Sequence, residues 1–401
     1  VYKRQEDAKN AIGFINDITD YSSIPFLEES ELINYIGENE LNAFLAEVKK
    51  QSLYEEKSDL KIVYTPLHGT GNIPVRKMLE GMDVTVVKEQ ELPDGNFSTV
   101  RSPNPEEKDA LTIAIEKAKE IGADLVLGTD PDCDRVGIAV NNGNGEFQLM
   151  TGNEVGAMLL NYLLSQKKEQ GTLSKNSIAV KSFVSTDLAE VIAKKYNCTF
   201  KNLLTGFKYI GELITQLESE GRSEDFVMGF EESYGYLAGT HARDKDAVVA
   251  SMLICEMAAY YKAQGKTLID VMNGLYDEFG YYCNTVQSYT FEGASGMEKM
   301  AAIMDGLRVN KPSSFAGYEV TKIDDYKTSK STDVKTGEES EITLPKSNVL
   351  AYTLTDGNKV IVRPSGTEPK IKAYITAIGT SEENAKQIAQ KLLKDADELM
   401  K

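Results

Sequence analysis

Short apolar runs alternate with longer amphipathic stretches along the first part of the chain. A β-branched and aromatic run at 61–64 is followed by a turn-rich segment and an amphipathic stretch at 73–80. The pattern then predicts strands at 84–87 and 124–127 and a helix at 105–121. Strands and helices in alternation are typical of a largely parallel sheet covered by helices.

The same alternation starts again further along the chain. The predicted elements are a helix at 153–165, a strand at 178–183, helices at 186–195 and 207–218, a strand at 226–229, and helices at 245–261 and 268–279. Apolar residues recur with helical spacing in the 245–261 stretch. We therefore expect a second α/β unit.

After Gly280 the pattern predicts strands without intervening helices. It indicates a polar loop at 327–341, strands at 350–353, 359–362 and 371–377, and a last helix at 381–400 that Ser381 can cap. The predicted fold class is α/β, with two three-layer mixed-sheet domains followed by a smaller α+β C-terminal domain.

Composition and charge narrow the class of protein. The chain has 401 residues and a formal charge of −18, which opposes binding to nucleic acids and anionic membranes. Its apolar runs are too short to cross a bilayer, and the first residues are polar. Its four cysteines lack paired spacing. We expect a soluble, cytoplasmic protein with no nucleic-acid or membrane partner.

Three alternate aspartates follow the predicted strand at 124–127. The segment Gly128-Thr129-Asp130-Pro131-Asp132-Cys133-Asp134-Arg135 precedes a second apolar strand. Carboxylates crowded on a short loop would repel one another without a cation, and oxygen ligands suit Mg²⁺. A solvated acidic turn is the alternative, because Asp and Pro are common in turns. Cys133 is a poor ligand for a hard cation.

Two further loops carry polar groups suited to a sugar phosphate. Gly229-Phe230-Glu231-Glu232-Ser233-Tyr234-Gly235 ends a predicted strand, where α/β proteins bind ligands, and His241 and Lys245 follow. Arg363-Pro364-Ser365-Gly366-Thr367-Glu368-Pro369-Lys370 combines a guanidinium, hydroxyls and a glycine that suit an anion. Taken singly, either loop could equally be an ordinary turn.

Together and in this order, the three loops resemble the hallmarks of the α-D-phosphohexomutase family, which includes phosphoglucomutases and phosphomannomutases. The segments TPLHGTGN at 65–72, SPNPE at 102–106 and TGFKYIGE at 205–212 are also similar to family segments. The family has four domains around a cleft, and this chain resembles the last three. The resemblance implies a first-domain remnant and linker at 1–40, a metal-loop domain at 41–150, a sugar-loop domain at 151–280 and a phosphate-binding domain at 281–401.

The resemblance also implies roles for individual residues. It places Mg²⁺ on Asp130, Asp132 and Asp134, with Arg135 beside the phosphoryl group. The remaining expected groups are the sugar ligands Glu231 and Ser233, the phosphate ligands Arg363, Ser365, Gly366 and Thr367, the cations or proton-transfer groups His241 and Lys245, and the positioning residue Lys208. Lys370 is a weaker phosphate candidate.

Family members transfer phosphate through a phosphoserine in a Thr-Ala/Ser-Ser-His-Asn-Pro type loop, which we do not find in this chain. His68 and His241 are its only histidines and lie in other motifs. We expect a phosphoglucomutase that interconverts glucose 1-phosphate and glucose 6-phosphate through glucose 1,6-bisphosphate, with this chain as its inactive C-terminal portion. Phosphomannomutase, phosphopentomutase and a noncatalytic phosphosugar-binding protein remain alternatives.

Overall fold

The structure, a computed structural model, describes residues 34–56, 58–291, 295–365 and 369–400. The chain divides into two units, with the boundary between Ala43 and Phe44. Helix α3 (Glu38–Lys49) runs through this boundary. The unit that begins at Phe44 contains all three sheets of the described chain.

The first sheet has the strand order β2-β1-β3-β4-β5. Its strands are β1 (Lys61–Thr65), β2 (Asp83–Val86), β3 (Leu125–Thr129), β4 (Val136–Asn141) and β5 (Phe147–Met150). The first three are parallel, whereas β4 and β5 are antiparallel to their neighbours. Helices α4 (Asn72–Met78) and α5 (Thr112–Ile121) follow β1 and precede β3. The β3–β4 connection is the acidic loop.

The second sheet has the order β7-β6-β8-β9. Its strands are β6 (Ile178–Ser182), β7 (Thr199–Leu203), β8 (Phe226–Glu231) and β9 (Gly235–Ala238), and its helices are α6 (Gly152–Glu169), α7 (Leu188–Lys195), α8 (Lys208–Ser219), α9 (Ala247–Lys262) and α10 (Leu268–Phe279). The parallel strands β6, β7 and β8 are joined by helical connections. Strands β8 and β9 form a hairpin. The segment 229–235, which contains the turn of this hairpin, is called the sugar loop below. Both α/β units predicted from the sequence are present.

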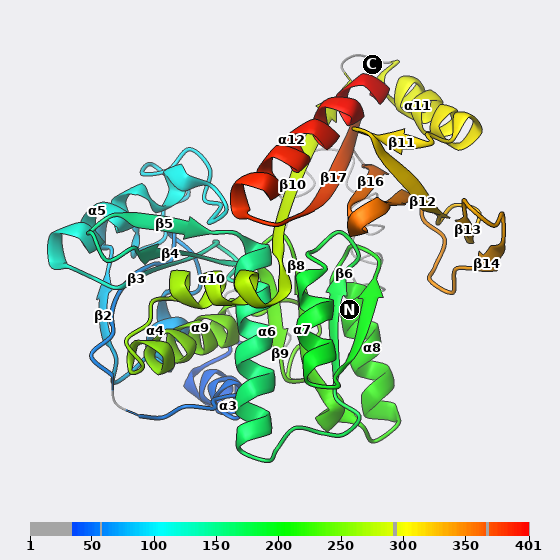
Figure 1. Cartoon of the computed structure of the whole chain (residues 1–401). Coiled ribbons are helices and arrows are strands. Elements are labelled where there is room, and N and C mark those ends of the chain that lie inside the picture. Colours follow the sequence, from blue (N-terminus) through cyan, green and yellow to red (C-terminus); the bar gives the residue numbers. More distant parts are fainter. Residues whose placement is uncertain (1–33, 57, 292–294, 366–368, 401) are drawn as a thin grey trace, which may run out of the picture. The chain divides into compact units, whose positions relative to one another are not determined.

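The third sheet is antiparallel, with the order β10-β17-β16-β15-β12-β13-β14 and β11 paired to β12. Its strands are β10 (Tyr281–Thr290), β11 (Ser314–Phe315), β12 (Tyr318–Asp325), β13 (Lys330–Asp333), β14 (Glu339–Glu341), β15 (Leu350–Leu354), β16 (Lys359–Pro364) and β17 (Lys370–Gly379). Helix α12 (Glu382–Leu399) packs along β10 and β17 (Figure 1). This arrangement confirms the expected fold class.

Three predictions about secondary structure were wrong. The segment after Gly280 does contain a helix, α11 (Gly296–Asn310), whose Met300, Met304 and Leu307 face the core. The predicted polar loop at 327–341 is largely the hairpin β13–β14, whose exposed polar strands give no apolar signal. The predicted helix at 105–121 begins only with a 3-10 turn at Lys108–Leu111. Prolines at 103 and 105 disfavour helix before that point.

Helix α9 is buried along most of its length and holds an ionisable group. Glu256 accepts hydrogen bonds from the Ser52 hydroxyl and, at 3.0 Å, from the Leu53 N–H. Burial raises the pKa of Glu256 despite these bonds. The native protein therefore keeps the Glu256 carboxyl protonated to a higher pH than the unfolded chain does. The free energy of unfolding falls as pH rises from the unfolded pKa of this group to its raised native pKa.

Glu256→Gln should remove this dependence. We expect the difference in melting temperature between variant and wild type to shift in favour of the variant as pH rises from 4.5 to 7.5, measured by thermal unfolding at several pH values. Glu116→Gln, at an exposed position of α5, is the control. A difference that is constant over this range would contradict the assignment.

Candidate functional site

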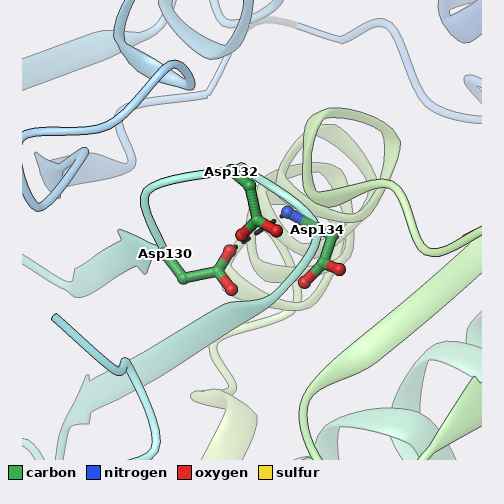
Figure 2. Close-up of side chains that lie close together, drawn as sticks. All are labelled: Asp130, Asp132 and Asp134. Atoms are coloured by element: carbon green, nitrogen blue, oxygen red, sulfur yellow. Dashed lines mark hydrogen bonds between the residues drawn. The ribbon is translucent and has the colours of Figure 1, made fainter. Parts of the chain in front are cut away.

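The acidic loop between β3 and β4 brings three carboxylates together. One oxygen from each of Asp130, Asp132 and Asp134 lies within 4.8 Å of the others (Figure 2). Asp130 is buried and Asp132 is exposed. Asp130 Oδ1 accepts hydrogen bonds from the N–H groups of Asp134 at 3.0 Å and Arg135 at 2.9 Å. The loop is therefore folded around Asp130.

The electrostatics of this loop suit a hard cation. Burial raises the pKa of Asp130 to about 6, and the neighbouring Asp134 carboxylate raises it too, against hydrogen bonds from Arg135. Carboxylates gathered in this way are the donor set that Mg²⁺ prefers. Burial also raises the pKa of the Cys133 thiol, so Cys133 stays protonated and is a poor ligand for a hard cation. The residues present thus fit a divalent magnesium ion.

Arg135 is held by carboxylates from two segments. Its Nε donates to Asp130 Oδ2 at 2.8 Å, and its Nη1 donates to Glu106 Oε1 at 3.1 Å and Asn104 Oδ1 at 3.4 Å. Burial raises the pKa of Glu106, although the charge of Arg135 and its hydrogen bond lower it. Sequence reasoning identified SPNPE as a family-like segment but gave Glu106 no part in the site. The pairing depends on tertiary contact over 29 residues, so the sequence alone offered no signal for it.

Glu106→Gln should loosen Arg135. A hydrogen bond to a charged group contributes about 1.5–3 kcal/mol, so weakening it should lower kcat/KM of the active protein about 10-fold. The effect should be measured by steady-state kinetics, with Glu107→Gln, at an exposed neighbouring position, as the control. Full activity in Glu106→Gln would show that Arg135 needs no second carboxylate.

The sugar loop forms the turn between β8 and β9. Glu231 is buried, and its Oε1 accepts a hydrogen bond from the Gly206 N–H at 2.7 Å. Burial raises the pKa of Glu231. Glu232 Oε2 accepts from the Ser182 hydroxyl at 2.9 Å and the Ser185 hydroxyl at 3.3 Å. Ser233 lies next to it and is half-buried.

The backbone joins the sugar loop to the acidic loop. The Val136 N–H donates to the Tyr234 carbonyl at 3.1 Å, and Arg135 forms an antiparallel bridge with Gly235. A Cβ on Gly235 would lie 2.1 Å from Cδ of Lys245, so only glycine leaves room for this lysine. The two loops therefore form one continuous site.

Lys245 is the cation that these loops share. Its Nζ lies 2.9 Å from Asp134 Oδ2 and 2.9 Å from Asp244 Oδ1, and 5.7 Å from the centroid of the Phe207 ring. Burial lowers its pKa, but the two carboxylates raise it by more, and the net shift is upward. Lys245 is therefore protonated at neutral pH.

His241 and Lys208 lie in different surroundings. The His241 side chain is buried, with Nε2 2.7 Å from Asp246 Oδ2, while Asp246 Oδ1 caps α9 by accepting from the N–H groups of Val248 and Val249. His241 Nδ1 has no hydrogen-bond partner among the described residues. Lys208 is exposed at the start of α8, with Nζ 5.0 Å from the centroid of the Tyr209 ring.

The expected phosphate ligands lie on and after β16. Arg363 and Ser365 line a cavity of about 460 Å³ together with Met297 and Asn348. Burial and the nearby Glu232 raise the pKa of Tyr374 to about 12, while its hydrogen bond with Arg363 lowers it. Gly366 and Thr367 lie outside the described residues. The Ser365 N–H donates to the Lys370 carbonyl at 2.7 Å, which closes this loop.

Comparison with known proteins gives the class of the chain. Residues 42–144, 151–279 and 317–394 match the phosphoglucomutase/phosphomannomutase alpha/beta/alpha domain II, alpha/beta/alpha domain III and C-terminal domain, respectively. The chain belongs to this family, the α-D-phosphohexomutases, as its three loops predicted.

Relatives of this chain include named enzymes. It is 38% identical over 367 residues to a phosphoglucomutase of Staphylococcus haemolyticus. The matched region covers 91% of this chain and 63% of that relative. It is 42% identical over 323 residues to a phosphoglucomutase of Staphylococcus epidermidis. The matched region covers 80% of this chain and 58% of that relative. The chain thus spans about three fifths of the length of these curated relatives.

Solved structures share the fold. Parafusin, a phosphoglucomutase from Paramecium, superimposes with a TM-score of 0.61 at 17% identity, covering 90% of this chain and 61% of that one. A phosphoglucomutase/phosphomannomutase family protein from Burkholderia thailandensis superimposes with a TM-score of 0.61 at 15% identity, covering 90% of this chain and 64% of that one.

The helices of the described residues are short or polar by the standard of a membrane span. None of them combines the length and the apolar character that a membrane crossing needs.

Proposed function

We propose that this chain carries the metal, sugar and phosphate sites of a phosphoglucomutase that interconverts glucose 1-phosphate and glucose 6-phosphate. The observation that carries the proposal is the junction of the acidic and sugar loops, which share Lys245 and a backbone bridge. The curated relatives named phosphoglucomutase support the choice of reaction.

The roles proposed for the side chains follow from their contacts. Bound magnesium would supply positive charge that offsets the charge on a transferring phosphoryl group, and the three aspartates would hold it. Arg135 and Lys245 lie next to those aspartates, so their cationic groups can stabilise the same phosphoryl oxygens. Lys245 is protonated and can also donate a proton to a sugar oxygen.

The remaining groups would orient the sugar phosphate. Glu231 and Ser233 are proposed to bind sugar hydroxyls, and Arg363 and Ser365, with Gly366 and Thr367, to hold the phosphate that is not transferred. Such a distant phosphate site lets the bisphosphate bind in either direction, so that one pocket serves both halves of the reaction. Glucose 1,6-bisphosphate is the proposed intermediate, and a phosphoserine is the proposed phosphoryl carrier.

The role proposed for His241 is indirect. Its ring is buried and its Nε2 faces Asp246, which caps the helix that follows Lys245. We propose that His241 positions this turn, and that Lys245 is the group that transfers protons. We also propose a cytoplasmic location, which the four unpaired cysteines support.

A coupled assay tests the proposed function. Glucose 1-phosphate, Mg²⁺ and glucose 1,6-bisphosphate are supplied to the 401-residue chain and to the longest natural reading frame that contains it. Glucose 6-phosphate formation by the longer protein supports the proposal. Preference for mannose 1-phosphate would assign a phosphomannomutase, and sugar-phosphate binding without turnover in either protein would favour a noncatalytic binding protein.

A further inference from the structure

A buried lysine lies on β6, the strand that pairs with β8. Lys181, the fourth residue of β6, is 1% exposed. Its Nζ donates to the Ser185 carbonyl at 3.0 Å and lies 3.2 Å from Asp187 Oδ1. A buried ammonium is costly unless it is paired and hydrogen-bonded, and these partners meet that requirement. The segment from 182 to 187 is therefore wrapped around Lys181.

Asp187 also pairs with a lysine of the third sheet. Its second oxygen, Oδ2, lies 2.6 Å from Nζ of Lys359, the first residue of β16. Burial raises the pKa of Asp187, but Lys181 and Lys359 lower it by more, so the carboxylate stays ionised between two cations. Arg363, a proposed phosphate ligand, lies on the same strand as Lys359.

The same segment also holds the sugar loop. The Ser182 and Ser185 hydroxyls both donate to Glu232 Oε2, next to the proposed sugar ligands. The Thr186 N–H donates to Asn153 Oδ1 at 2.8 Å, which fixes the segment on α6. Residues 182–187 thus contact the sugar loop through Ser182 and Ser185, and through Asp187 they contact β16, the proposed phosphate-binding strand.

An apolar cluster joins the segment 182–187 to β16 as well. It comprises Phe183, Val184, Leu204, Val349, Ala351, Ile361 and Tyr374, drawn from the segments around the second and third sheets. Apolar contact stabilises the two surfaces together but is not directional. The Asp187 side chain is mostly buried, whereas that of Lys359 is 31% exposed. An ion pair with a short contact has a defined geometry, so the Asp187–Lys359 pair can fix the relative position that the apolar contacts leave free.

We propose that Asp187 and Lys359 are positioning residues that set the distance between the sugar loop and the phosphate-binding strand. A ligand that carries a sugar and a distal phosphate must contact the sugar loop and the phosphate-binding strand at once. Loss of the Asp187–Lys359 pair should therefore weaken the binding of this ligand without changing the acidic loop. This inference rests on the proposed function, because it assumes that both loops bind one sugar phosphate.

The test replaces Lys359, since Asp187 then still pairs with Lys181 and no buried cation is left alone. Lys359→Met should weaken glucose 1-phosphate binding about 3- to 10-fold by isothermal titration calorimetry, because residues that couple distant sites change affinity by such factors. Lys359→Arg should restore most of it. Lys330→Met, which removes the Lys330–Glu339 pair at 2.7 Å elsewhere in the same sheet, is the matched control and should bind like wild type.

A double variant separates positioning from general loss of stability. Ser185→Ala together with Lys359→Met should weaken binding less than the product of the two single effects, because both act through residues 182–187. Mg²⁺ affinity should be unchanged in every variant. Wild-type affinity for glucose 1-phosphate in Lys359→Met, or strictly multiplicative effects, would overturn the inference. Absence of binding to the wild-type protein would instead contradict the proposed function.

Discussion

Lys245→Met is expected to lower mutase turnover by about 100-fold or more, the usual contribution of a positioned proton donor or cation. Lys245 is in contact with Asp134 and is protonated, so its loss removes both a positive charge and a proton from the site. The measurement is steady-state kcat in the coupled assay. Lys245→Arg keeps the charge and should retain part of the activity.

Lys262→Met provides a matched control for this experiment. Lys262 also lies between two carboxylates, 2.9 Å from Asp124 and 3.2 Å from Asp59, but it belongs to the far end of α9. Its loss should leave turnover unchanged. Equal losses in both variants would mean that removal of a paired lysine impairs folding generally, and near-normal turnover in Lys245→Met would exclude a direct role for Lys245.

Asp132→Asn is expected to weaken Mg²⁺ binding by about 100-fold. Even the loss of a residue that only hydrogen-bonds to a metal ligand lowers metal affinity by about 10- to 100-fold. Asp132 is exposed, whereas Asp130 accepts the hydrogen bonds that fold the loop. The substitution should therefore leave the melting temperature of the metal-free protein nearly unchanged. Titration calorimetry with Mg²⁺ measures the affinity.

Asp109→Asn is the control, because Asp109 is exposed and lies outside the acidic loop. Mg²⁺ affinity should stay at the wild-type value in this variant. Wild-type affinity in Asp132→Asn would indicate either that the metal lies on the other two aspartates alone or that the loop is a solvated turn.

The loops could be found from the sequence because each is a dense, contiguous set of unusual residues between apolar strands. Asp130, Asp132 and Asp134 are neighbours on one loop, so local spacing alone predicted that they meet. The alternating elements of the two α/β units were equally visible. The hairpin β13–β14 was missed because its strands are polar and exposed, so no apolar period marks them.

The partners of the loops could not be predicted in the same way. Glu106 with Arg135, and Asp187 with Lys359, are joined only by the folded chain. The burial of His241 also depends on tertiary packing. Asp246 just before an apolar helix, however, is a recognisable N-cap signal that sequence reasoning left unused.

The bridge between Arg135 and Gly235 has a consequence for how sugar preference can evolve. Its links are made by main-chain atoms, and substitutions at Glu232 or Ser233 do not remove those atoms. If the proposed roles hold, a proposed sugar ligand such as Ser233 can therefore diverge among descendants while the groups proposed for phosphoryl transfer keep their place. Insertions or deletions in the turn would shift both together, so drift in specificity should proceed by residue replacement at constant loop length.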